Sequence, residues 1–313
     1  MQYRGRRAKR RKRPKYPCLS AFSAIEKIAT ISADCGPRDD TLLQPDQVEM
    51  RAQATGTPKS QPQSVRSPWA LELISLTKSF DRPAVDGLDL AVRGGEFYAL
   101  LGPNGAGKTT TLKMVVGLLR PDSGFISVLG IDALANPVAA KQIMAWISDE
   151  PMIYDKLTPF EYLEFVAGLW AVDPGVAEAR ARDLLDWLGL ADHAHERCEG
   201  FSKGMRQKVA LAGALMHDPR VIVLDEPLTG LDAASARQVK TALRERVRDG
   251  DTVIMTTHIL EVAERIADRI GIIAGGRLIA QGTLEELREQ AGKSRTSLED
   301  TFLALVASQT VAA

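Results

Sequence analysis

The chain has 313 residues, of which 45% are hydrophobic, enough for one large domain or two small ones with a buried core. No stretch approaches the roughly 18 consecutive apolar residues of a membrane-spanning helix, which excludes such a helix and favours a soluble or peripheral protein. Its three cysteines are scattered, without a C-x-x-C spacing, so they suggest neither a disulfide framework nor a zinc site and fit a reducing cytoplasm.

The first 69 residues differ in charge from the rest of the chain. They hold 14 basic and 6 acidic residues, a net charge of +8, whereas the remainder carries −8. This segment is rich in Arg, Pro, Gln and Ser, which is typical of a disordered extension. Electrostatics would allow it to contact nucleic acid or anionic lipid. We interpret residues 1–69 instead as a solvated tail, or as the product of a start codon placed too early.

From Trp69 onward, strand-like stretches alternate with helical ones. This alternation predicts an α/β fold with a mainly parallel sheet flanked by helices. The stretch Pro159–His217 is rich in helix formers and too long for a simple crossover between two strands, so it predicts an inserted α-helical subdomain. The buried strands are expected at Phe97–Leu101, Ile143–Ser148, Val221–Leu224 and Thr252–Thr257.

The first of these strands leads into a loop that matches the pattern G-x-x-x-x-G-K-[ST] in full. Its glycines let backbone N–H groups turn inward around phosphate oxygens. Lys108 is placed to reach the β- and γ-phosphates, and Thr109 to offer its hydroxyl to Mg²⁺. The spacing of apolar residues in Thr110–Leu119 predicts an amphipathic helix whose N-terminus faces the anion. The predicted phosphate site consists of Gly102, Pro103, Asn104, Gly105, Ala106, Gly107, Lys108, Thr109 and Thr110.

Polar residues follow the three later strands. Ligands of open α/β sheets lie at the carboxyl ends of strands, which predicts Asp225 near the metal and Glu226 near the γ-phosphate. Asp149 and His258 also end strands, and a histidine there can donate to the γ-phosphate and hold an attacking water. An isolated Asp-Glu pair would be read as a helix cap, and a lone histidine as a structural residue. Beside a phosphate loop, the catalytic interpretation of Glu226 and His258 is favoured.

The stretch Phe201–Lys208 resembles the signature motif of ABC-type ATPases. With it, the family's motifs occur in the family's order over about Leu71 to Leu287: phosphate loop, glutamine loop, signature, Walker B, D-loop and switch histidine. The resemblance implies a P-loop NTPase (RecA-like) core with an antiparallel β subdomain. It implies an ATPase domain at residues 70–290, with the helical subdomain at about 150–217 and a C-terminal helical tail at 291–313.

By the same resemblance, Phe80 would stack on adenine. Ser202 and Gly204 would cap a helix aimed at the γ-phosphate of a nucleotide held by a second protomer. A helix terminus contributes only about 1 kcal/mol, so this contact would supplement the phosphate loop. Gly230–Asp232 matches the D-loop that crosses the interface. ATP would therefore lie between two copies of the ATPase domain, in a homodimer or a heterodimer.

The sequence departs from the family pattern at three positions. Lys203 stands where the commonest signature has Gly, and Met205 stands near its usual Gln. Asp149 occupies the glutamine-loop position. An acid there can still coordinate Mg²⁺ or orient water. Thr109, Asp149 and Asp225 therefore make up the expected metal set.

Three stretches of the chain are similar to bacterial ABC-2-type exporter subunits: Ser148–Pro151, the Ser-Lys-Gly-Met signature and Ser297–Phe302. The similarity implies an ATPase that powers transport, in the export direction, through separate transmembrane permease subunits. Such a protein would lie at the cytoplasmic face of the plasma membrane. The permease is expected on the surface that follows Asp149, including Tyr154, Lys156 and Leu157.

Two other classes of protein share a phosphate loop. A non-transport ABC ATPase acting on ribosomes or DNA would use the basic extension as its nucleic-acid contact. Ribosome-acting relatives usually carry two phosphate loops, and DNA-repair relatives a long coiled coil. The sequence has neither, so a nucleic-acid partner is not expected. A stand-alone kinase would lack the signature motif. The transported substrate is not encoded in this chain, because selectivity belongs to the permease.

Overall fold

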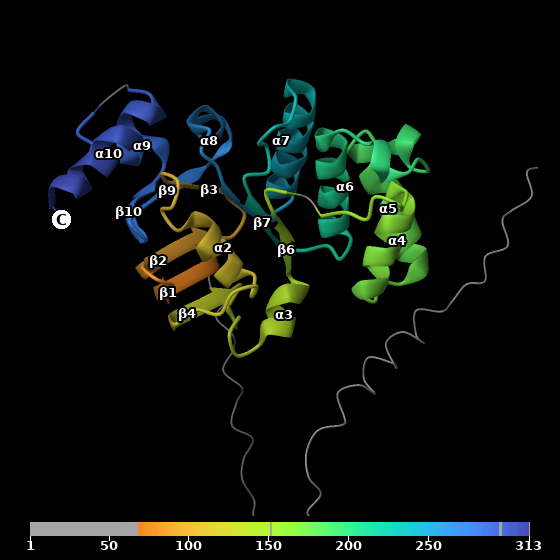
Figure 1. Ribbon diagram of the computed structural model, residues 1–313, viewed down its shortest axis with the longest axis horizontal. Coiled ribbons are helices and arrows are strands. Elements are labelled where there is room, and N and C mark those ends of the chain that lie inside the picture. Colours follow the sequence, from red (N-terminus) through yellow and green to blue (C-terminus); the bar gives the residue numbers. More distant parts are fainter. Residues whose placement is uncertain (1–67, 151, 294–295, 313) are drawn as a thin grey trace, which may run out of the picture. The chain divides into compact units, whose positions relative to one another are not determined.

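The computed structural model describes residues 68–150, 152–293 and 296–312. The basic segment expected to be a disordered extension, residues 1–69, lies outside the described residues except for its last two. The described part contains two sheets with helices packed around them (Figure 1).

The central sheet has six strands in the order β10-β9-β3-β8-β7-β6. All neighbours are parallel except β10, which pairs with β9 in the antiparallel direction at one edge. Every residue of β3, β7 and β8 is buried, as expected for strands covered on both faces. The four strands expected from the sequence are confirmed. The strands are β3 (Phe97–Leu101), β6 (Met144–Ile147), β7 (Val221–Asp225), β8 (Thr252–Thr256), β9 (Arg269–Ala274) and β10 (Arg277–Gly282).

A second, antiparallel sheet has the order β2-β1-β4-β5, which confirms the expected antiparallel β subdomain. Buried residues of its three long strands form one hydrophobic cluster with β3, β7 and helix α2 (Lys108–Val115), so the two sheets enclose that helix. Figure 1 shows α2 between them. The strands are β1 (Trp69–Ser79), β2 (Pro83–Arg93), β4 (Ser123–Val128) and β5 (Ile131–Asp132).

The helix expected at Thr110–Leu119 is shorter and begins earlier than the apolar spacing predicted. It starts at Lys108, directly after Gly107, and ends at Val115. Gly117 has a φ of +69°, a left-handed conformation that cannot continue a helix. The prediction was wrong there because Val116 and Leu119 are apolar through packing in a hydrophobic cluster, although they lie beyond the helix.

An inserted group of helices comes between β6 and β7 in the chain, as expected, and lies to one side of the central sheet (Figure 1). Thr158 starts the first of them with a capping box that includes Glu161. Each of the first two helices buries residues spaced three or four apart, so one stripe faces the core. The third contacts both β6 and α7. These elements are α4 (Pro159–Leu169), α5 (Pro174–Trp187), the 3₁₀ turns η1 (Ala191–His193) and η2 (Cys198–Gly200), and α6 (Lys203–Leu215).

The remaining helices flank the two sheets. Leu298 and Leu305 of the last helix pack in a third hydrophobic cluster with β3, β9 and β10. Within the described ranges, no helix combines the length and the apolar character needed to cross a bilayer. These helices are α3 (Pro137–Gln142), α7 (Ala233–Arg248), α8 (Leu260–Ile266), α9 (Leu284–Gln290) and α10 (Leu298–Ala312).

Candidate nucleotide-binding site

The phosphate loop connects β3 to α2 and needs glycine at two positions. A Cβ added to Gly102 would lie 2.4 Å from the carbonyl oxygen of Ile273, and one added to Gly107 would lie 2.4 Å from that of Ala84. Gly107 also has a φ of +102°, which side chains rarely adopt. Backbone of β9 and β2 therefore presses against the loop, and the loop's shape depends on both glycines.

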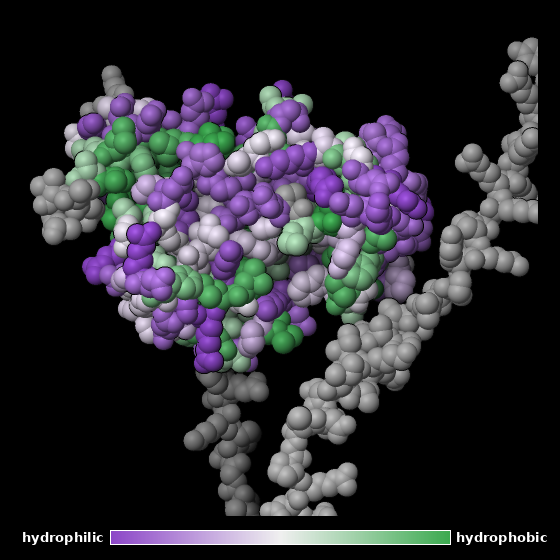
Figure 2. Space-filling view, in the orientation of Figure 1, coloured by the Kyte–Doolittle hydropathy of each residue, from purple (hydrophilic) through white to green (hydrophobic). Residues whose placement is uncertain are grey.

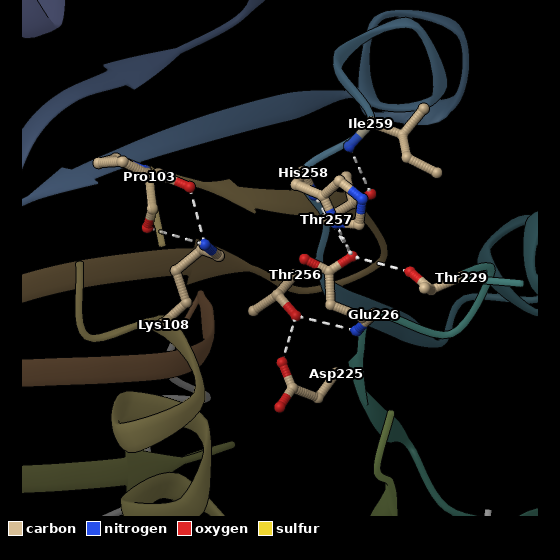
Figure 3. A network of polar contacts seen from close by, with 10 residues as sticks. Pro103, Lys108, Asp225, Glu226, Thr229, Thr256, Thr257, His258 and Ile259 are labelled. Atoms are coloured by element: carbon tan, nitrogen blue, oxygen red, sulfur yellow. Dashed lines mark hydrogen bonds and ion pairs between the residues drawn. The ribbon is translucent and has the colours of Figure 1, made fainter. Parts of the chain in front are cut away.

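Lys108 is the first residue of α2 and is buried. Its Nζ donates to the carbonyl oxygens of Gly102 at 2.7 Å and Pro103 at 3.2 Å (Figure 3). Burial lowers the pKa of Lys108, whereas the nearby carboxylates of Glu226 and Asp225 act to raise this pKa. The ammonium group is thus held by loop carbonyls, for which phosphate oxygens could substitute.

A pocket of about 580 Å³ opens beside this loop. Phe80 reaches it from the turn between β1 and β2, with 61% of its surface exposed. The structure therefore brings the expected adenine platform and the expected phosphate site to one pocket. Of the described residues, those lining it are Phe80, Asp81, Arg82, Pro83, Ala84, Asn104, Gly105, Ala106, Gly107, Lys108, Thr109, Thr110 and Glu226.

Two neighbouring strand ends supply the acidic side chains. Thr256, the last residue of β8, donates its hydroxyl to Asp225 Oδ1 at 2.5 Å and accepts the backbone N–H of Glu226 at 3.0 Å (Figure 3). Glu226 has a φ of +47°, which is uncommon for a residue with a side chain. One threonine therefore fixes both acidic residues at the point where β7 ends. Thr256 was not predicted from the sequence, although a threonine that ends an otherwise apolar strand is a signal for such a role.

Glu226 and His258 are in direct contact. Glu226 Oε2 lies 2.9 Å from His258 Nδ1, 3.3 Å from the His258 backbone nitrogen and 3.4 Å from the Thr229 hydroxyl. The Glu226 side chain is 19% exposed, and that of His258 is 55% exposed. The carboxylate is therefore fixed, and the more exposed histidine ring lies beside it (Figure 3). This arrangement suits a general base with a second polar group beside it.

The signature stretch forms a separate structure at the start of α6. Ser202 is the N-cap, and its Oγ accepts the N–H of Met205 at 3.3 Å. A Cβ added to Gly204 would lie 2.6 Å from Ser235 Oγ, so this glycine allows α6 to approach α7 closely. Asp232 caps α7 by accepting the N–H groups of Ala234 and Ser235. The expected signature and D-loop are thus in contact within one chain.

Asp149, Ser202 and Gly204 are not among the described residues that line the phosphate pocket. Asp149 is exposed, and its carboxylate accepts the N–H of Glu150 at 3.0 Å. No group of three or more His, Cys, Asp or Glu side chains in the described residues is arranged to hold a metal ion. Mg²⁺ in phosphate sites is commonly held by one or two carboxylates together with substrate oxygens. Thr109 and Asp225 fit that donor set.

Comparisons with known proteins agree with this geometry. The family model described as "ABC transporter" matches residues 85–229. ABC transporter ATP-binding protein NatA of Bacillus subtilis is 40% identical over 66% of this chain and 84% of its own length. Nod factor export ATP-binding protein I of Rhizobium meliloti is 36% identical over 77% of this chain and 72% of its own. A solved structure of the ATP binding subunit of an ABC transporter aligns with a TM-score of 0.71 and 33% identity. The alignment covers 75% of this chain and 99% of the chain in that structure.

Proposed function

The chain belongs to the ABC transporter family of ATP-binding ATPase subunits, and on that premise we propose that its ATP hydrolysis drives export through separate transmembrane permease subunits. The observation that carries the proposal is the joining of Lys108, Asp225, Glu226 and His258 at the carboxyl edge of one parallel sheet. The Rhizobium meliloti relative named for Nod factor export supports the direction. Residues 70–290 would form the ATPase domain, and residues 291–313 its helical tail.

In this proposal, the loop residues Gly102–Thr110 bind the phosphates and Phe80 stacks on adenine. Bound Mg²⁺ would neutralise developing phosphate charge. Thr109 and Asp225 would hold that ion, with Asp149 as a third ligand or as the residue that orients water. Because Thr256 fixes Asp225 from the neighbouring strand, the carboxylate needs little rearrangement to bind.

Hydrolysis would depend on Glu226 and His258. The carboxylate of Glu226 is fixed by donors from His258 and Thr229, so it is placed to accept a proton from an attacking water. The exposed ring of His258 would hold that water and donate to the γ-phosphate. Both roles require the γ-phosphate to lie in the pocket that Glu226 helps to line.

A second copy of the ATPase domain would complete the site. Ser202 and Gly204 shape the start of α6 but do not line the pocket described above. A capped helix N-terminus of this kind stabilises a nearby anion by about 1 kcal/mol. We propose that it contacts the γ-phosphate bound by the other copy, in a homodimer or a heterodimer.

The permease would bind beside the helical subdomain, at the cytoplasmic face of the plasma membrane. The segment after Asp149 exposes Met152 by 89% and Tyr154 by 59%. A groove of about 450 Å³ adjoins it, lined partly by Trp146, Tyr162 and Trp170. Figure 2 shows hydrophobic side chains gathered over α4, next to hydrophilic ones. An exposed apolar surface of this kind is typical of a protein–protein contact.

The variant Glu226→Gln tests the catalytic assignment. The amide keeps the size of the side chain but is not a base, so we expect turnover to fall by about 100-fold or more while ATP affinity stays near that of the wild type. Equilibrium ATP binding and steady-state phosphate release measure the two quantities. Glu261→Gln is the matched control, because Glu261 is exposed on α8. Near-normal hydrolysis by Glu226→Gln would remove this residue from the role of base.

A further inference from the structure

We propose that Asp122 is a positioning residue for the base-binding side of the pocket. It fixes the strand end that carries Phe80 and holds Lys78 against one face of the Phe80 ring, which leaves the other face for adenine. This inference rests on the proposed function, in which Phe80 stacks on the base. Asp122 directly precedes β4 and is not among the site residues predicted from the sequence.

Three hydrogen bonds join Asp122 to the last residues of β1. Its Oδ1 accepts from Lys78 Nζ at 2.6 Å, and its Oδ2 accepts the N–H of Ser79 at 2.7 Å. Its own N–H donates to the carbonyl oxygen of Thr77 at 2.9 Å. Three successive residues are therefore held by one aspartate. Phe80 is the next residue along the chain, so the origin of its side chain is fixed by these bonds.

Lys78, which is bound by Asp122, also contacts the aromatic ring of Phe80. Lys78 Nζ lies over the ring of Phe80, 5.7 Å from its centroid, a distance typical of a cation–π contact. The Lys78 side chain is only 16% exposed, whereas Phe80 is 61% exposed. The backbone N–H of Phe80 donates to the carbonyl oxygen of Arg82 at 3.1 Å and closes the turn. The ammonium group thus supports one face of an otherwise exposed ring.

The charge state of the pair suits this role. Hydrogen bonds from Lys78 and from the N–H of Ser79 lower the pKa of Asp122, so its carboxylate is ionised at neutral pH. An exposed aromatic side chain without such support loses more conformational freedom when a base stacks on it. Asp122 would therefore act on affinity for the base, through Lys78 and Phe80, and leave the phosphate loop unaffected.

The test compares two probes on the full chain: ATP, and inorganic tripolyphosphate, which has phosphates but no base. Asp122→Asn keeps the size of the side chain and removes its charge. We expect it to weaken ATP binding by about 3- to 10-fold, with tripolyphosphate affinity and kcat at saturating ATP unchanged. Lys78→Met should have the same effect. The double variant should bind ATP no more weakly than either single variant, because the two substitutions remove the same interaction.

Two further variants make the outcomes distinct. Asp86→Asn breaks an exposed ion pair between Asp86 of β2 and Arg277 of β10, and it should change neither affinity. Phe80→Ala should weaken the binding of ATP and leave the binding of tripolyphosphate unchanged. If Phe80→Ala leaves ATP affinity unchanged, the adenine platform of the proposed function is wrong. Suppose that Phe80→Ala weakens ATP binding. If Asp122→Asn then leaves ATP binding unchanged, or weakens the binding of ATP and of tripolyphosphate equally, the positioning role of Asp122 is overturned and Asp122 only joins β1 to β4.

Discussion

The starts of α2 and α6 are both helix N-termini at which a glycine allows a close approach, to backbone of β2 at α2 and to a side chain of α7 at α6, yet the chain surrounds them differently. At α2, Lys108 and Glu226 line one pocket, and Thr256 at the end of β8 binds the backbone of Glu226. At α6, Ser202 caps its own helix, and Gly204 rests against α7. The first region is a pocket assembled within the chain, and it is the proposed nucleotide site. The second has the shape of an anion contact, and its proposed ligand belongs to another copy.

The two regions also differ in what holds them. The strands that end at the phosphate pocket are buried along their whole length. Around the start of α6, Cys198 packs in the core, and two ion pairs lie nearer the surface, Arg206 of α6 with Asp155 at 2.5 Å and Lys156 with Glu199. Such pairs contribute at most about 1 kcal/mol each. We therefore expect substitutions at α2 to abolish binding, and substitutions at α6 to alter turnover.

Gly107→Ala should have the largest effect in this comparison. The new Cβ would lie 2.4 Å from the carbonyl oxygen of Ala84, at a φ of +102°. Backbone strain alone costs about 1–3 kcal/mol, and the clash adds to it. We expect the free energy of unfolding to fall by about 3 kcal/mol or more and ATP binding to be lost. Chemical denaturation and equilibrium ATP binding measure these changes.

Gly250→Ala is the matched control for that variant. Gly250 has a φ of +99°, and nothing lies within 4 Å of an added Cβ. It should show only the conformational cost, about 1–3 kcal/mol, with unchanged ATP affinity. If the two variants lose equal stability and both still bind ATP, the close approach of β2 to the loop does not determine the site.

Gly204→Ala tests the second region and should have an intermediate effect. Its Cβ would lie 2.6 Å from Ser235 Oγ, which forces the start of α6 away from α7. A misplacement of about 1 Å can lower turnover by about 100-fold. We expect that loss in steady-state ATPase activity of the dimer, with ATP affinity of the isolated chain unchanged.

Two variants show whether that effect comes from the α6–α7 contact. Gly200→Ala, close by in sequence and with nothing within 4 Å of an added Cβ, should leave turnover unchanged. Ser235→Gly on the Gly204→Ala background removes the atoms that the new Cβ meets and should restore part of the activity. A Gly204→Ala variant that loses ATP affinity as strongly as turnover would show that the two regions are not separate.

Features that depend on neighbouring residues could be predicted from the sequence, whereas contacts between distant residues could not. The strands and the phosphate loop were predictable because a continuous apolar run, a glycine pattern and strand-end acids are all local signals. The end of α2 at Val115 was not, because apolar residues beyond it pack in a turn. The contacts of Asp122 with Lys78 and of Thr256 with Asp225 join residues far apart in the chain. No local pattern specifies such partners.

The smallest expected effects concern α4, where two variants at its two ends should change stability in opposite directions. Thr158→Ala removes the capping box and should cost about 1 kcal/mol of unfolding free energy. Gly168→Ala should add about 0.5–1 kcal/mol, because Gly168 is exposed and an added Cβ meets nothing within 4 Å. Denaturation and hydrogen exchange of α4 measure both. Neither variant should change ATP affinity, since α4 contributes no side chain to the phosphate pocket among its described lining residues. If Thr158→Ala lowers ATP affinity and Gly168→Ala does not, the inserted helices help to hold the phosphate site. The regions at α2 and α6 would then not be separate.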